Sequence, residues 1–149
     1  MENVRELIQI MTRRFGFLDR NCCSVGDTDL SLVQSHILYE IDRQHQPSMQ
    51  QIAQTLGIDI TTFSKQIQSL VKMKLVKKTP SPDDRRVSIL SLTTEGTFIA
   101  TMIDQEMNQY LEEVFGYMSV EEREMVLRSI KLLNANMAKS KKCCNPIGE

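Results

Sequence analysis

No apolar run in this chain of 149 residues approaches the ~20 residues that a membrane-spanning helix needs, so no such helix is expected. The first residues, Met1 to Glu6, also lack the basic region and apolar core of a secretory signal peptide. We therefore expect a cytoplasmic protein with no membrane partner, in which the four cysteines are mostly reduced.

The motifs of common enzyme classes are missing as well. The sequence has no Gly-rich phosphate loop, no His-Glu-x-x-His pair and no nucleophile elbow. Its cysteines occur as adjacent pairs, whereas thiol oxidoreductases carry Cys-x-x-Cys. We therefore predict no catalytic residues, no enzymatic activity and no required cofactor.

The small net charge of −1 conceals an uneven distribution. Residues 59–93 hold seven Lys and Arg against three acids, whereas the rest of the chain holds eleven against sixteen. A basic segment on an acidic body is typical of proteins that bind phosphate backbones, although a charged run also fits a merely solvated face.

Helical periodicity dominates the chain. It predicts a first helix over about residues 3–19, then a loop from Asn21 to Asp29. Capping-box patterns at Ser31 and Ser48 predict two further helices, and Gly57 suits the left-handed residue that ends the second. The side chains expected to be buried in these two helices are Leu32, Val33, Ile37, Leu38 and Ile41, and Met49, Ile52, Ala53 and Leu56.

A helix capped by Asp59 and continuing to about Met73 carries most of the predicted chemistry. Its expected apolar face consists of Phe63, Ile67, Leu70 and Val71. The opposite face presents hydroxyl, amide and ammonium groups, which suit base edges and phosphates. These groups belong to Thr61, Thr62, Lys65, Gln68, Ser69 and Lys72, with Ser64 on a flank. The alternative is an amphipathic surface helix with no partner.

A β-hairpin is predicted next, with strands over Leu75 to Thr79 and Val87 to Leu92. Pro80 and Pro82 cannot donate to a strand ladder and are assigned to the connecting loop. Arg85 and Arg86 lie at the tip of this loop, where a guanidinium can enter a narrow minor groove. Asp84 lies close enough to orient Arg86. The alternative is a surface hairpin with an ion pair worth about 0–1 kcal/mol.

Two long helices are predicted to complete the chain, beginning at Thr94 and at a capping box formed by Ser119 and Glu122. Their apolar stripes are too extensive for one small domain to cover, which favours pairing of two chains. The stripes consist of Phe98, Met102, Ile103, Tyr110, Leu111, Val114 and Met118, and of Val126, Ile130, Leu133 and Met137.

These motifs together resemble the MarR family of bacterial transcriptional regulators. The shared features are Pro82-Asp83, Asp84-x-Arg86-x-x-x-Leu90-x-Leu92-Thr93, Gly96, and a helix-turn-helix over Ile52 to Ile58 and Phe63 to Val71, with Leu75-Val76. The resemblance implies a mainly α fold with a small β-hairpin wing. It assigns residues 31–93 to a winged helix-turn-helix domain, residues 1–30 and 94–142 to a helical dimerisation region, and residues 143–149 to a tail.

The resemblance also implies a function: a homodimer that binds an inverted repeat in double-stranded DNA, represses by occupying a promoter, and is released by an effector. The two recognition helices of such a dimer lie about 34 Å apart. A winged helix used only for protein contact is the alternative.

The effector is the least determined feature. We expect Cys22, Cys23, Cys143 and Cys144 to form a thiolate site for arsenite or a soft metal ion, or a redox pair, because soft centres select thiolates. Lys139, Lys141 and Lys142 beside the second pair would lower its thiol pKa values. The alternative for these residues is an apolar packing role and an uninvolved tail.

A second hypothesis places a small aromatic effector between the winged domain and the dimerisation helices. Its candidate lining residues are Met11, Phe15, Phe17, His36 and Tyr39. Such residues at helical spacing also fit a plain core.

Overall fold

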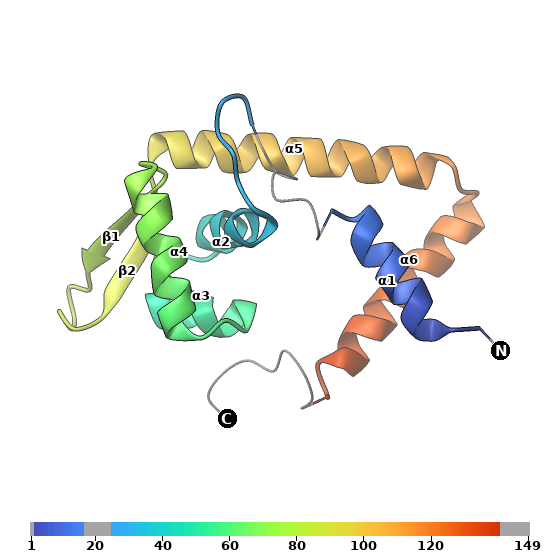
Figure 1. Cartoon of the computed structure of the whole chain (residues 1–149), viewed down its shortest axis with the longest axis horizontal. Coiled ribbons are helices and arrows are strands. Elements are labelled where there is room, and N and C mark those ends of the chain that lie inside the picture. Colours follow the sequence, from blue (N-terminus) through green and yellow to red (C-terminus); the bar gives the residue numbers. More distant parts are fainter. Residues whose placement is uncertain (1, 17–24, 141–149) are drawn as a thin grey trace.

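The computed structural model describes residues 2–16 and 25–140 of the chain. Over these ranges the protein is mainly helical with one two-stranded antiparallel hairpin, which confirms the predicted fold class (Figure 1). The elements in chain order are α1 (Val4–Arg14), α2 (Leu32–Arg43), α3 (Met49–Leu56), α4 (Ile60–Lys72), β1 (Val76–Pro80), β2 (Ser88–Leu92), α5 (Thr94–Gly116) and α6 (Val120–Met137).

Helix starts follow the predicted caps. Ser31, Ser48 and Ser119 each accept a hydrogen bond from the backbone N–H three residues on and complete a capping box. The Asp59 side chain caps α4 by accepting a hydrogen bond from the backbone N–H of Thr62. Gly57 ends α3 with φ of 66°, the left-handed conformation that glycine adopts without a Cβ penalty. These local interactions fix where the helices of the winged domain begin and end.

One apolar core holds α2, α3, α4, the hairpin and the first half of α5 together. Its central side chains are fully or almost fully buried, and no polar side chain is buried among the described residues. The core residues are Val25, Leu30, Ile37, Leu38, Ile41, Ile52, Ala53, Phe63, Ile67, Leu70, Leu75, Val76, Leu90, Ile99 and Ile103. Val33 and Val71, which we expected to be buried, are exposed instead, because their neighbours in sequence already fill the core-facing stripes of α2 and α4.

The hairpin differs slightly from its predicted bounds. Its strands pair from Val76 with Leu92 to Pro80 with Ser88, so Leu75 and Val87 lie just outside them. Pro80 belongs to β1 and not to the loop, which corrects the prediction. Proline is tolerated there because Pro80 is the last residue of its strand. In a two-stranded hairpin it also has no second neighbouring strand to which a backbone N–H could donate a hydrogen bond.

The first helix is shorter than predicted. It ends at Arg14, and Gly16 adopts a positive φ of 95° that stops the helical path. The predicted continuation over residues 17–19 lies outside the described residues.

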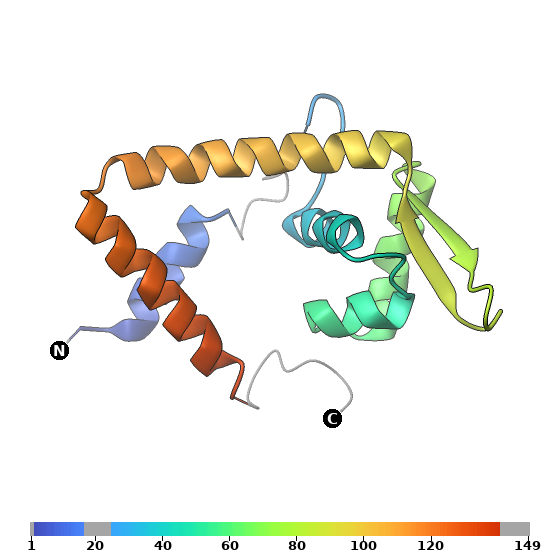
Figure 2. The ribbon, with the colours of Figure 1, turned by 180° about the vertical axis from the view of Figure 1, so that it is seen from behind.

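Helix α5 runs along one side of the molecule and joins the winged domain at one end to α6 at the other (Figures 1 and 2). Neither α1 nor α6 buries a residue within this chain. Large apolar side chains on α6, including Ile130, Leu133 and Met137, are exposed. No helix among the described residues is both long and apolar enough to cross a membrane.

Candidate nucleic-acid interface

Helices α3 and α4 form the predicted helix-turn-helix. The backbone N–H of Ile58 donates to the carbonyl of Ala53 (3.0 Å), which closes the turn between the two helices. Phe63, Ile67 and Leu70 then anchor one side of α4 in the core. Because this side is fully used for packing, the opposite side of α4 is left facing away from the protein.

The exposed side of α4 carries the residues that the sequence predicts for DNA contact. Thr61, Lys65, Gln68 and Lys72 are all exposed, and Ser64 is half-buried on the flank. Their order along the helix places hydroxyl groups near the first turn and ammonium groups further along. This arrangement suits a helix that meets bases at its leading end and phosphates along its length.

A shallow hollow lies on this side of α4. It is bounded by one apolar residue, Ile60, and by Thr61, Ser64, Lys65 and Gln68. The sequence prediction missed Ile60, although its spacing of four and eight residues from Ser64 and Gln68 would have placed all three in one row. An exposed isoleucine therefore adds an apolar group to an otherwise polar face.

Thr62 is engaged with the helix cap. Its hydroxyl donates to Asp59 Oδ2 (2.6 Å), and its backbone N–H donates to Asp59 Oδ1 (2.9 Å). These two hydrogen bonds, the hydroxyl first, lower the pKa of Asp59 below its ordinary value. The hydroxyl proton of Thr62 is therefore committed within the protein, and what Thr62 offers outward is its methyl group and an oxygen lone pair.

The tip of the wing is organised by Asp84. Its carboxylate accepts from Arg86 Nε (3.2 Å), Arg86 Nη2 (3.2 Å) and the Arg86 backbone N–H (3.0 Å). The side-chain contact with Arg86, followed by the backbone one, lowers the pKa of Asp84. The Arg86 side chain is nevertheless 91% exposed. Asp84 thus orients a guanidinium that remains accessible, as the sequence analysis predicted.

Two contacts fix the hairpin to the rest of the winged domain. The backbone N–H of Leu90 donates to the carbonyl of Pro47 (2.8 Å), next to a bridge between Ser48 and Ile89. Thr93 Oγ1 donates to the carbonyl of Lys74 (2.7 Å). The wing and α4 consequently lie at the same end of the molecule in a fixed arrangement (Figure 1).

Further cations at this end have no acidic partner among the described residues, and three of them lie on α4 and at the tip of the wing. Within residues 2–16 and 25–140, Lys65, Lys72 and Arg85 form no ion pair, and all three side chains are exposed. Their charge is available to an external anion. The basic segment identified in the sequence is therefore a surface feature.

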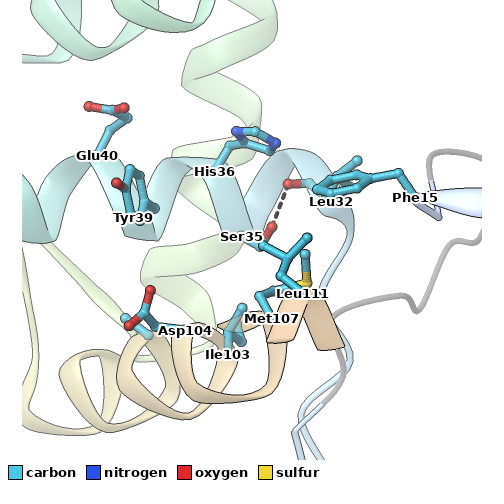
Figure 3. A pocket seen from close by; sticks show the side chains of 11 residues that line it. Phe15, Leu32, Ser35, His36, Tyr39, Glu40, Ile103, Asp104, Met107 and Leu111 are labelled. Carbon is cyan, nitrogen blue, oxygen red and sulfur yellow. Dashed lines mark hydrogen bonds between the residues drawn. The ribbon is translucent and has the colours of Figure 1, made fainter. Parts of the chain in front are cut away.

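A cavity of about 470 Å³ lies between α2 and α5, close to the end of α1 (Figure 3). Of the predicted lining residues, the structure brings Phe15, His36 and Tyr39 together here, whereas Met11 does not line the cavity and Phe17 lies outside the described residues. The full lining is Phe15, Leu32, Ser35, His36, Tyr39, Glu40, Ala100, Ile103, Asp104, Met107 and Leu111.

The thiolate hypothesis concerns parts of the chain that the structure leaves undescribed. Cys22, Cys23, Cys143 and Cys144 all lie outside residues 2–16 and 25–140. The described residues contain no group of three or more His, Cys, Asp or Glu side chains placed to hold a metal ion. The thiolate site stays a prediction.

Comparison with known proteins gives one family and one fold. Residues 28–87 match the model of the MarR family. The HTH-type transcriptional regulator PrsX of Escherichia coli is 33% identical over 98 residues, which make up 66% of this chain and 54% of PrsX. The chain therefore spans about half the length of PrsX and of PapX, a second HTH-type transcriptional regulator of E. coli that it matches.

Solved structures share the fold over most of the chain. FabT of Streptococcus pneumoniae, solved in complex with DNA, superimposes with a TM-score of 0.81 at 19% identity, covering 90% of this chain and 94% of FabT. The DNA complex of MepR from S. aureus gives 0.77 at 17% identity, covering 91% and 99%. PrsX is named as a transcriptional regulator, and the solved structures show that this chain shares their fold.

Proposed function

From the match of residues 28–87 to the MarR family, we propose that the chain is a member of that family and a homodimeric DNA-binding transcriptional regulator, which represses the promoter that it occupies. The observation that carries the proposal is the fixed arrangement of α4 and the wing, which presents Lys65, Lys72, Arg85 and Arg86 at one end of the molecule. A DNA partner places the protein in the cytoplasm.

In this mechanism α4 enters the major groove with its first turn leading. The hydroxyl and amide groups of Thr61, Ser64 and Gln68 meet base edges, while Lys65 and Lys72 neutralise phosphates. Arg86, oriented by Asp84, enters the adjacent minor groove, where the negative potential attracts a guanidinium. Wing and helix together read one half-site.

A second copy of the chain covers the surfaces that this copy leaves open. Neither α1 nor α6 buries a residue alone, and the exposed stripe of Ile130, Leu133 and Met137 on α6 is what a homodimer interface needs. Two-fold symmetry then matches an inverted repeat with half-sites about 34 Å apart.

A titration with the promoter DNA upstream of the protein's own gene tests this proposal. Lys65, Lys72 and Arg85 of each chain predict about six phosphate contacts per dimer, so affinity should fall roughly thousand-fold or more between 50 and 200 mM salt. Saturation should occur at two chains per duplex. Salt-insensitive binding, or no binding to the promoter or to random duplexes, would contradict DNA binding and favour a winged helix used for protein contact.

We propose further that an effector releases the DNA, and that it acts at Cys22, Cys23, Cys143 and Cys144. The chemical support is the affinity of paired thiolates for trivalent arsenic and soft metal ions. The cavity bounded by Phe15, His36 and Tyr39 favours a second candidate, a small aromatic effector, because its volume and largely apolar lining suit such a molecule.

Replacing all four cysteines by serine separates the two candidates. Under reducing conditions arsenite should weaken promoter binding by the natural protein about ten-fold or more, and the serine variant should bind DNA normally but ignore arsenite. Fluorescence anisotropy of labelled promoter DNA provides the measurement. An arsenite response that persists in the serine variant would contradict the thiolate site.

A further inference from the structure

An isoleucine on α4 is exposed beside the polar face of the helix. Ile60 is the first residue of the helix, and its side chain is 50% exposed. It lies outside the core that anchors α4 through Phe63, Ile67 and Leu70. It instead bounds the hollow on the outward side of the helix, together with Thr61 and Gln68.

Ile60 lies in the part of α4 that would enter the major groove most deeply. Residues of the first turn of a recognition helix approach base edges most closely, while later turns follow the backbone. Asp59 and Thr62 hold this turn through two hydrogen bonds, so Ile60 projects from a rigid helix start. An apolar side chain is thus fixed where the helix would meet base pairs.

The major groove offers one apolar group, the C5-methyl of thymine. Apart from the small C–H groups, the other groups on the major-groove edges are hydrogen-bond donors or acceptors, and covering one of those with isoleucine would remove its water without replacing the hydrogen bond. The methyl of Thr62 lies in the same turn, and its hydroxyl proton is already used by Asp59. The first turn of α4 therefore contains two apolar groups, the Ile60 side chain and the Thr62 methyl, beside its polar groups.

We propose that Ile60 is a specificity-determining residue that packs on a thymine methyl, so each operator half-site has a thymine facing the first turn of α4. This inference rests on the proposed DNA-binding function and specifies which base Ile60 selects within that interface. Burial of one methyl group corresponds to about four-fold in affinity, so the two half-sites of a dimer together should contribute roughly ten- to twenty-fold.

Replacing thymine by deoxyuridine tests the contact with the natural protein, because it removes the C5-methyl and leaves every hydrogen-bonding group in place. Duplexes are first selected from a random pool by binding to the purified protein. Thymines at symmetry-related positions of the selected duplex are then replaced pairwise by deoxyuridine, and affinities are measured by anisotropy. One pair of positions should lose roughly ten- to twenty-fold.

Two variants assign that loss to Ile60. Ile60→Ala should bind the thymine and deoxyuridine duplexes within about two-fold of each other. Val71→Ala is the matched control, since Val71 is an exposed, β-branched residue eleven positions along the same helix and so on nearly the same flank, but in the last turn. Val71→Ala should keep the full deoxyuridine penalty.

Three results would overturn the inference. The first is that no pair of deoxyuridines changes affinity by more than two-fold. The second is that the penalty persists undiminished in Ile60→Ala. In both cases salt-sensitive DNA binding by the natural protein would leave the proposed function standing. The third result, no salt-sensitive binding of any duplex, would remove the proposed function and this contact with it.

Discussion

Replacing Arg86 by alanine is expected to weaken DNA binding about ten-fold for each wing, and so about a hundred-fold for a dimer with both wings changed. Arg86 is the one wing residue whose guanidinium is both oriented, by two contacts of 3.2 Å with Asp84, and exposed. Its removal deletes a charge and a preorganised donor from the same place. The fold should not change, because the Arg86 side chain contacts no part of the core.

Anisotropy titrations with promoter DNA at several salt concentrations measure this effect. Arg43→Ala is a suitable control, because it removes the same charge from the end of α2, outside α4, the wing and the helices proposed to form the dimer. Arg86→Lys separates charge from geometry: it should restore only part of the affinity, since lysine lacks the planar fork. Unchanged affinity in Arg86→Ala would show that the wing does not contact DNA.

Replacing Gly96 by alanine is expected to lower the free energy of unfolding by about 2 kcal/mol or more. Gly96 lies buried in the first turn of α5, where an added Cβ would overlap the carbonyl oxygen of Leu75. That oxygen cannot withdraw easily, because it accepts hydrogen bonds from the backbone N–H (3.0 Å) and the hydroxyl (3.3 Å) of Thr93. The start of α5 would have to move away from the hairpin.

Thermal or urea unfolding followed by circular dichroism gives the size of the loss. Gly116→Ala is the matched control, since it makes the same substitution in the same helix at a position where a Cβ meets nothing within 4 Å. It should be neutral or stabilise the protein by up to about 1 kcal/mol, because alanine favours helix. Equal stabilities of the two variants would contradict the contact between α5 and Leu75.

Much of the candidate interface could be predicted from the sequence because the interactions that build it are local. The caps at Ser48 and Asp59 and the left-handed Gly57 depend on residues within one turn, so they can be identified from the order of residues alone. The same holds for Asp84 and Arg86, which lie two residues apart and contact each other directly.

The errors at Val33, Val71 and Ile60 share a physical origin. Val33 and Val71 fall near the predicted apolar stripes, but a helix buries only the side that faces its neighbours, and those neighbours are set by the tertiary fold. Ile60 was overlooked for the same reason, since an apolar residue at helical spacing is indistinguishable from a core residue until the packing is known.

The amino-acid sequence by itself determined the helix starts, the hairpin and the basic segment, because short-range hydrogen bonds and periodic burial leave direct traces in residue order. Only the tertiary structure decided why Gly96 must be glycine, that Phe15, His36 and Tyr39 share a cavity with α5, and that Ile60 is exposed on α4. These features depend on segments distant in sequence coming into contact, and the position of such contacts is fixed by packing of the whole core.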